Sequence, residues 1–369
     1  MTQPPQQRSL FDAEPAPWEL DEQAEQLVAV VVFSSAPWGP FDYSVPDHLR
    51  AAITLGKRVR VPLGRGDRMN NGYCVKLENR PVGTRQLKPL AELLDDHSLF
   101  SQPMLRLTEW IADYYLCHWG QALDAVVPAG VRQAAGTREM AFFTLSKPLA
   151  ASALPKLSPM QTAVLEVLKK ATKPLSLQQL MRAADVTAAP IQSLRKKGLI
   201  VADTRRVMQT DVDDSPLPRE TNHELHADQV NALRTILDTL NSAQHRTILM
   251  HGVTGSGKTE VYIRAIEEVI RFGRQAIVLV PEISLTPQTR QRFRSRFERV
   301  AVLHSHLSDS ERHWHWQRIA RGEVEVIVGA RSAIFAPTPH LGLIILDEEH
   351  DGSFKQDSAP RYHARDVAE

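Results

Sequence analysis

The sequence is poor in cysteine, in net charge and in long apolar runs. Its two cysteines, Cys74 and Cys117, are too few for a disulfide framework or a four-cysteine zinc site, and isolated thiols suit a reducing cytoplasm. A net charge of +1 gives no support for bulk attraction to nucleic acid, so any such surface must be local. The apolar runs at 27–33, 276–280 and 341–346 are too short to span a bilayer and indicate buried strands, and no signal peptide is visible.

What remains is the composition of a globular protein, with 43% hydrophobic and 24% charged residues. A length of 369 residues predicts two or three domains. Residues 1–24 are rich in Pro, Gln, Asp and Glu, which predicts a disordered tail. Within it, Gln7, Leu10 and Phe11 resemble the short peptide by which bacterial replication and repair proteins bind the sliding clamp. A tail without function is the alternative.

The stretch with the most chemical information is 251–260, HGVTGSGKTE. Gly252, Gly257, Lys258 and Thr259 fit the pattern G-x-x-x-x-G-K-[ST], in which backbone N–H groups surround nucleotide phosphates. Lys258 is expected to reach the β- and γ-phosphates of ATP, and Thr259 to offer its hydroxyl to Mg²⁺. The expected nucleotide contacts are Gly252, Val253, Thr254, Gly255, Ser256, Gly257, Lys258 and Thr259.

The flanking residues favour a true phosphate-binding loop over a chance match in a surface turn. Residues 246–250 are β-prone and predict a strand immediately before the loop. Residues 258–272 carry apolar side chains at helical spacing and predict a helix after it. The N-terminus of that helix would add its dipole and free N–H groups to anion binding.

The last third of the chain alternates strand-like and helix-like segments. Apolar segments at 277–288, 324–337 and 341–350 predict a parallel, doubly wound sheet behind the loop. Ligands of such sheets bind at the carboxyl ends of the strands, which is where Asp347 and Glu348 fall. We expect Asp347 to hold Mg²⁺ and Glu348 to orient and activate the attacking water.

The segments before the loop predict two smaller units. Strand-like runs at 27–33, 58–64 and 72–78 indicate a small β-rich unit, such as a barrel or a module that binds peptide or nucleic acid, and residues 103–123 look helical. Residues 158–207 predict three helices and a hairpin, which is typical of a winged helix. Residues Arg195, Lys196 and Lys197 could meet phosphates at the end of the third helix, and a purely structural winged helix is the alternative.

Four motifs together resemble the superfamily-two helicases. They are DEEH at 347–350, PEISLTPQ at 281–288, GARSA at 329–333 and SFKQDSAPRYHARDVA at 353–368. Within that superfamily the chain resembles the N-terminal half of the PriA family, which restarts bacterial replication forks. The resemblance implies a multidomain α/β fold whose parts are a tail at 1–24, a β-rich 3′-DNA-end-binding domain at 25–135, a winged helix at 150–210, a linker at 211–220, and the first RecA-like P-loop lobe at 221–369.

The resemblance also implies functional residues. In the family a Phe-Asp-Tyr segment helps to hold the 3′ end, which corresponds to Phe41, Asp42 and Tyr43. From sequence alone, a turn residue near Pro40 and Pro46 is the favoured interpretation of Asp42. Lys88 is a further DNA contact implied by resemblance, and Gln229 matches a glutamine that recognises adenine. In the lobe, contacts to single-stranded DNA are expected from Thr286, Gln288, Arg331 and Ser332, whose side chains suit phosphate.

Three further features invite functional interpretations. Phe354 and Tyr362 belong to an aromatic-rich loop that, by resemblance, links bound DNA to the ATP site, and base stacking would suit them. Residues 290–299 are basic and helical, with Arg292, Arg296 and Arg299 on one face, which would line a DNA groove or form a solvated face. The histidines at 304, 306, 313 and 315 suggest a metal site, but they lack a clear tetrahedral ligand set, and we expect none.

The family resemblance implies an ATP-dependent 3′–5′ DNA helicase that uses ATP and Mg²⁺, acts in the bacterial cytoplasm at the nucleoid, and meets forked or single-stranded DNA, primosome proteins and single-strand-binding protein. It implies zinc only in a second half that this sequence does not contain. The alternative is a fork-binding module without enzymatic activity, because a second lobe normally completes the ATP site. A more distant alternative is a winged-helix regulator that is switched by nucleotide binding.

Overall fold

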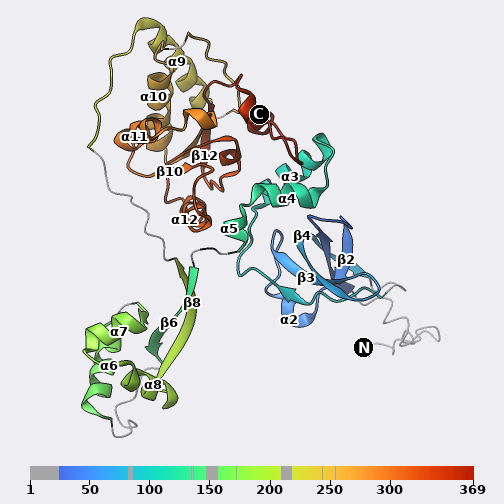
Figure 1. The fold of residues 1–369 in the computed structure, drawn as a ribbon, viewed down its shortest axis with the longest axis vertical. Helices are drawn as coiled ribbons and strands as arrows, with labels where there is room; N and C mark the ends of the chain where they lie inside the picture. Colours follow the sequence, from blue (N-terminus) through green and yellow to red (C-terminus); the bar gives the residue numbers. More distant parts are fainter. Residues whose placement is uncertain are drawn as a thin grey trace, which may run out of the picture. The chain divides into compact units, whose positions relative to one another are not determined.

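The computed structural model describes residues 25–81, 86–133, 135, 137–146, 157–171, 173–208, 218–242, 244–253 and 255–369, with the backbone only for 137–140 and 205–208. These residues fall into two compact units, each treated by itself: one draws on 1–129, 215–306 and 315–369, the other on 130–214 and 307–314. Figure 1 labels the elements. The predicted tail, with Gln7, Leu10 and Phe11, and most of the predicted linker lie outside the described residues.

The first unit begins with a five-stranded antiparallel sheet in the order β2-β1-β4-β3-β5. Alternate side chains of the strands, among them Val31, Val59, Val61 and Cys74, meet in a buried core. Each such side chain removed from water contributes about 1.5–3 kcal/mol. The prediction of a β-rich N-terminal region is therefore confirmed. The strands are β1 (Glu25–Val32), β2 (Phe41–Ser44), β3 (Arg58–Leu63), β4 (Arg68–Pro81) and β5 (Glu92–Leu93).

The helical segment predicted at 103–123 is two helices that pack on each other. The Ser101 side chain caps the first by accepting a hydrogen bond from the Met104 N–H. Leu116 has φ = 51°, a left-handed conformation that breaks the helical run before the second helix begins. The helices in this part of the chain are α2 (Asp47–Arg50), α3 (Gln102–Tyr114), α4 (Trp119–Val126) and α5 (Ala129–Arg132).

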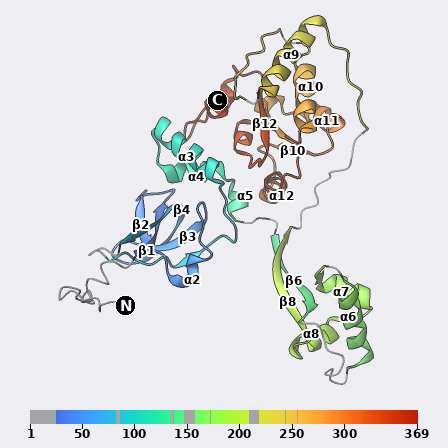
Figure 2. The ribbon, with the colours of Figure 1, turned by 180° about the vertical axis from the view of Figure 1, so that it is seen from behind.

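Among the described residues, the second unit includes three whole helices and a three-stranded sheet in the order β7-β6-β8, together with most of α5 and residues 307–314. Ser158 caps α6 and Pro159 occupies its first turn, as predicted. The prediction of a hairpin at 198–208 is wrong, because Ile200–Met208 forms one continuous strand, β8. The strand that pairs with β8 is β6, which precedes the residues predicted to form the winged helix. Figure 2 shows these two strands side by side. The elements are β6 (Thr137–Leu145), α6 (Pro159–Lys170), β7 (Leu175–Ser176), α7 (Leu177–Ala184), α8 (Ala188–Lys196) and β8.

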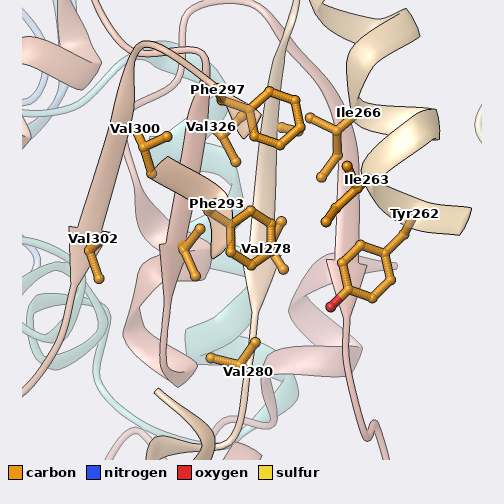
Figure 3. Packing of buried hydrophobic residues seen from close by; sticks show 12 residues of the cluster. Tyr262, Ile263, Ile266, Val278, Val280, Phe293, Phe297, Val300, Val302 and Val326 are labelled. Atoms are coloured by element: carbon orange, nitrogen blue, oxygen red, sulfur yellow. The ribbon is translucent and has the colours of Figure 1, made fainter. Parts of the chain in front are cut away.

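The last part of the first unit holds a four-stranded parallel sheet in the order β10-β11-β9-β12, which confirms the predicted parallel sheet. In Figure 3, Ile263 and Ile266 of α10, Phe293 of α11 and Phe297, which follows α11, pack with the valines of the sheet. The elements from here to the end of the chain, of which α12 begins in the second unit, are α9 (Ala227–Asn241), α10 (Lys258–Arg271), β9 (Gln275–Leu279), η1 (Glu282–Ser284), α11 (Pro287–Arg296), β10 (Val300–Leu303), α12 (Asp309–Ala320), β11 (Val326–Gly329), η2 (Arg331–Phe335), β12 (Leu341–Leu346), η3 (Gly352–Phe354) and α13 (Ala364–Ala368).

The predicted strand at 246–250 is not formed. These residues have no strand partner, and the Leu249 side chain is 76% exposed. A β-prone sequence becomes a strand only where a neighbouring strand satisfies its N–H and C=O groups, and no described strand is hydrogen-bonded to this segment. Within the described ranges, no helix has both the length and the apolar character needed to cross a bilayer.

Candidate nucleotide-binding site and DNA-contacting residues

The glycine loop leads directly into α10, which begins at Lys258 as predicted. Gly255 and Gly257 have φ of 81° and 80°, in the left-handed region that favours glycine, and Gly257 is the N-cap of α10. The Lys258 ammonium donates a hydrogen bond to the Gly252 carbonyl at 2.7 Å. The lysine is therefore held over the loop, within reach of a phosphate placed there. Thr254 lies outside the described residues.

Gln229 ties this loop to α9. Its side-chain amide donates to the Ser256 carbonyl at 2.8 Å, and its side-chain oxygen accepts from the His226 N–H, also at 2.8 Å. A Cβ on Gly257 would lie 2.4 Å from the same amide nitrogen and would displace the Gln229 side chain, and the left-handed φ of 80° disfavours any residue but glycine there. Gln229 thus lies at the phosphate loop, and its predicted contact with adenine stays a prediction.

The acidic residues Asp347, Glu348 and Glu349 directly follow β12, and Asp347 contacts α10, the helix that begins at the glycine loop. The Asp347 N–H donates to the Leu279 carbonyl at 2.9 Å, which continues the pairing of β12 with β9. The Tyr262 hydroxyl, on α10, donates to Asp347 Oδ2 at 3.1 Å. The Thr259 side chain lies close enough to this hydroxyl to lower its pKa. Tyr262 therefore lies beside both residues that were predicted to hold Mg²⁺.

Tyr262 was not predicted as a site residue. Burial raises the pKa of its hydroxyl well above the usual range, and the negative charge of Asp347 raises it further, so the hydroxyl stays protonated and available as a donor. The signal in the sequence was weak: a tyrosine three residues after Thr259 on a helix whose other buried positions are mostly aliphatic. Only the fold places it opposite Asp347.

The two glutamates after Asp347 contact different side chains. Glu348 has φ = 53°, which is uncommon for a residue with a Cβ and typical of functional sites. Its carboxylate lies 3.8 Å from His350 Nε2. Glu349 instead forms an ion pair with Arg365, with Nη1 and Oε2 3.2 Å apart. The two neighbouring glutamates are thus separated, and Glu348 is the one without an arginine partner within the described residues.

The donor set fits Mg²⁺ carried by a nucleotide rather than a protein-built metal cage. Mg²⁺ takes oxygen ligands, keeps several waters, and is bound by one or two protein groups together with substrate phosphates, which matches Thr259 and Asp347. In the described part of the chain, no group of three or more His, Cys, Asp or Glu side chains could hold a metal ion. Two of the clustered histidines, His313 and His315, are buried.

The residues predicted to hold a DNA 3′ end lie at the edge of the N-terminal sheet. Asp42 is on edge strand β2, exposed, and accepts from Arg80 Nη1 at 2.7 Å. Tyr43 is buried, with its hydroxyl donating to the Pro62 carbonyl, so it supports the strand from within. The Lys88 backbone pairs with Ser44 at the end of β2, and its ammonium contacts Asp67 and the Gly64 carbonyl.

The helicase-motif residues predicted to contact DNA occupy loop and helix-start positions. Thr286 is the N-cap of α11, where its side chain accepts from the Thr289 N–H, and Gln288 and Ser332 are exposed. Arg331 begins η2 and donates from Nη1 to the Ser353 and Lys355 carbonyls. Arg331 therefore braces the aromatic-rich segment in this structure.

Phe354 and Tyr362 are buried, at 0% and 3% exposure. The Tyr362 ring packs edge-on against Phe335, with centroids 4.9 Å apart. Neither ring presents a face on which a base could stack in this arrangement. Their predicted role in sensing DNA thus needs either movement of the loop or an indirect route.

Neither interpretation of the basic segment 290–299 holds for Arg296. Its side chain is 3% exposed and pairs with Glu260 and Glu267 of α10 at 2.9 and 3.1 Å. Arg299 lies beyond the end of α11 and pairs with Glu325 instead. The charge pattern alone could not distinguish a DNA-binding face from an ion pair between helices.

In the second unit, Arg195 and Lys196 are exposed at the end of α8, and Lys197 donates to the side chain of Gln161.

Comparison with known proteins adds family information to this geometry. Residues 29–128 match the model of the PriA 3′ DNA-binding domain, and residues 226–365 match the DEAD/DEAH box helicase model. The Bacillus subtilis replication restart protein PriA is 34% identical, over 89% of this chain and 49% of the relative. The Chlamydia pneumoniae protein of the same name is 37% identical, over 95% and 47%. The chain thus spans about half the length of the curated relatives it matches.

Proposed function

Because this chain is homologous to the replication restart protein PriA over most of its length, we propose that it recognises forked DNA with a 3′ end and binds ATP at the loop 252–259. In the whole protein these activities serve 3′–5′ unwinding driven by ATP hydrolysis, so that a primosome assembles and the replicative helicase is reloaded. The observation that carries the proposal is the meeting of Thr259, Tyr262 and Asp347 beside a glycine loop of the required pattern.

The ATP site would work mainly by positioning and by neutralising charge, which is what phosphoryl transfer requires. The backbone N–H groups of the loop and the N-terminus of α10 bind the phosphates. When ATP binds, the Lys258 ammonium exchanges its hydrogen bond to the Gly252 carbonyl for one to the γ-phosphate. Thr259 and Asp347 would hold Mg²⁺, which supplies further charge neutralisation when bound. Glu348 orients the attacking water and accepts its proton.

The N-terminal sheet would supply recognition of the DNA end. A carboxylate such as Asp42 can accept a hydrogen bond from a terminal 3′-hydroxyl, whereas an internal nucleotide carries a phosphodiester at that atom. Asp42 is supported for this role by its exposure on edge strand β2. Phe41 would lie against the last base or sugar, and Tyr43 would fix the strand from the core.

The remaining assignments follow from the same family relationship. Contacts to the backbone of the translocated DNA strand would come from Thr286, Gln288, Arg331 and Ser332. The aromatic-rich loop, held in place by Phe354 and Tyr362, would link this bound DNA to the ATP site. Primosome proteins and single-strand-binding protein are the proposed partners, in the bacterial cytoplasm at the nucleoid.

The deciding experiment measures ATP hydrolysis by this chain with and without forked DNA bearing a free 3′ end. The Lys258→Ala variant serves as the control for contaminating ATPases. Turnover that rises with DNA and disappears in the variant supports an enzyme. Fork binding without turnover favours a recognition module whose chemistry needs a second lobe. Absence of both nucleotide binding and fork binding overturns the proposal.

A further inference from the structure

Tyr115, at the end of α3, contacts residues that lie about 250 positions later in the chain. Its hydroxyl donates to Asp366 Oδ2 at 2.6 Å and accepts from the His363 N–H at 3.0 Å. The Lys355 ammonium lies over its ring, 4.8 Å from the centroid. One side chain of the region matched to the 3′ DNA-binding domain therefore makes three polar contacts with the segment after the DEEH motif, all within one compact unit.

The contacted segment is itself connected to the acidic end of β12. Asp366 lies in α13 next to Arg365, and Arg365 forms the ion pair with Glu349. Glu349 directly follows Glu348, the residue assigned to the attacking water. A series of polar contacts thus runs from Tyr115 through Asp366 and Arg365 to Glu349, which is the chain neighbour of Glu348.

The other side of the segment is braced by Arg331. It donates to the carbonyls of Ser353 and Lys355, and Lys355 forms an antiparallel bridge with His363. The stretch from 353 to 366 is therefore held at one end by a predicted DNA-contacting arginine and at the other by Tyr115. This arrangement gives a physical route for the aromatic-rich segment to respond to DNA although Phe354 and Tyr362 are buried.

We propose that Tyr115 is a positioning residue that couples the DNA-end-binding domain to the nucleotide site through Asp366, Arg365 and Glu349, so that DNA and nucleotide strengthen each other's binding. The inference rests on the proposed function, since it presupposes both ligands. A hydroxyl that both donates and accepts fixes the position of a neighbouring segment in a way that ring packing alone does not, because hydrogen bonds are directional. Such coupling is a reciprocal free energy between two sites.

The test measures the affinity of the chain for a fluorescent ATP analogue in Mg²⁺, with and without saturating 3′-ended DNA. Coupling of this kind is typically about 5–150-fold in affinity. Tyr115→Phe removes one oxygen and keeps the ring. We expect it to reduce the DNA-dependent change to less than about twofold, while the affinity for each ligand alone and the melting temperature stay near those of the unmodified chain.

Two variants make the result specific. Tyr114→Phe is the matched control, because Tyr114 is 59% exposed and its hydroxyl makes no hydrogen bond to the described residues. It should keep the full coupling. Asp366→Ala should lose the coupling as Tyr115→Phe does, and the double variant should lose no more, because both changes break the same contact.

The outcomes separate this inference from the proposed function. Coupling that persists in Tyr115→Phe, or that is absent from the unmodified chain although both ligands bind, overturns the role of Tyr115 and leaves the proposed function standing. If the unmodified chain binds the ATP analogue no better than Lys258→Ala does, or fails to bind 3′-ended DNA, the proposed function fails and this inference fails with it.

Discussion

The hydroxyl of Tyr262 lies 3.1 Å from Oδ2 of Asp347, 85 residues later, and connects the helix after the glycine loop to the acidic end of β12. The Thr259 side chain also lies close to this hydroxyl, so one buried tyrosine holds Asp347 by a hydrogen bond beside a second predicted Mg²⁺ ligand. Mutation of a residue that orients a metal ligand typically lowers metal affinity by about 10–100-fold.

Tyr262→Phe should therefore raise the Mg²⁺ concentration needed for half-maximal nucleotide binding by on the order of 10-fold. The ring stays in the core, so the melting temperature should change little. A Mg²⁺ titration at fixed fluorescent nucleotide measures this, with Tyr73→Phe, a tyrosine in the N-terminal sheet, as the control. An unchanged titration midpoint would show that Asp347 needs no such support.

Lys258 and Glu348 should separate binding from chemistry. Lys258→Ala is expected to abolish nucleotide binding, because it removes the cation that faces the phosphates. Glu348→Gln should keep binding but lower DNA-stimulated hydrolysis by about 100-fold or more, since the amide cannot accept the proton of the attacking water. Equilibrium binding and steady-state turnover are measured on the same preparations. Normal turnover in Glu348→Gln would remove Glu348 from its assigned role.

Asp42 should report on the chemistry of the DNA end. The unmodified chain is expected to bind an oligonucleotide ending in a 3′-hydroxyl about 10-fold more tightly than one ending in a 3′-phosphate, because a hydrogen bond to a charged acceptor contributes about 1.5–3 kcal/mol. Asp42→Ala should bind both equally. Asp47→Ala, which changes an exposed acid of the same domain, is the control and should keep the preference. Equal affinities in the unmodified chain would contradict the assignment.

Arg296 should matter for stability rather than for DNA. Arg296→Met leaves Glu260 and Glu267 without their buried partner and should lower the free energy of unfolding by about 3 kcal/mol. Arg299→Met, at a pair in which the arginine is 54% exposed, should cost less than about 1 kcal/mol. Urea titrations monitored by tryptophan fluorescence compare the two. Similar losses would mean that burial of Arg296 is energetically unimportant.

The same cluster predicts how stability depends on pH. Burial by itself would raise the pKa of Glu260, but the hydrogen bonds and charge of Arg296, with a further contribution from Arg264, outweigh it and hold the pKa below its ordinary value of 4.5. Because the pKa is lower in the folded state, the carboxylate's contribution is fully present above about pH 4.5 and is lost as the pH falls through the folded pKa.

Melting temperatures measured between pH 6 and pH 3 should therefore fall more steeply for the unmodified chain than for Arg296→Met, which lacks the interaction that titrates. Parallel curves for the two proteins would assign the acid sensitivity to other carboxylates.

Local signals in the sequence predicted much of the site. The helix α10 does begin at Lys258, with Gly257 in a left-handed conformation as its N-cap, and Asp347 does follow a parallel strand. These features depend on residues close to one another in sequence, where backbone sterics and side-chain periodicity suffice. That parallel strand, β12, was expected to be buried, but its residues are only partly buried and Leu341 is exposed. The strand expected at 246–250 failed because pairing depends on a neighbour that no local pattern specifies.

The sequence by itself determined the glycine loop that leads into a helix, the acids after β12, the parallel direction of the strands in the last third and the β-rich character of the N-terminal region. Each follows from local conformation and from the pattern of apolar residues. Only the tertiary structure decided that Arg296 is an internal ion-pair partner, that Tyr262 joins Asp347, that Phe354 and Tyr362 are buried, and that Tyr115 reaches Asp366. Contacts between residues 29 to 251 positions apart depend on how whole elements pack, and charge or aromaticity at a single position does not reveal its partner.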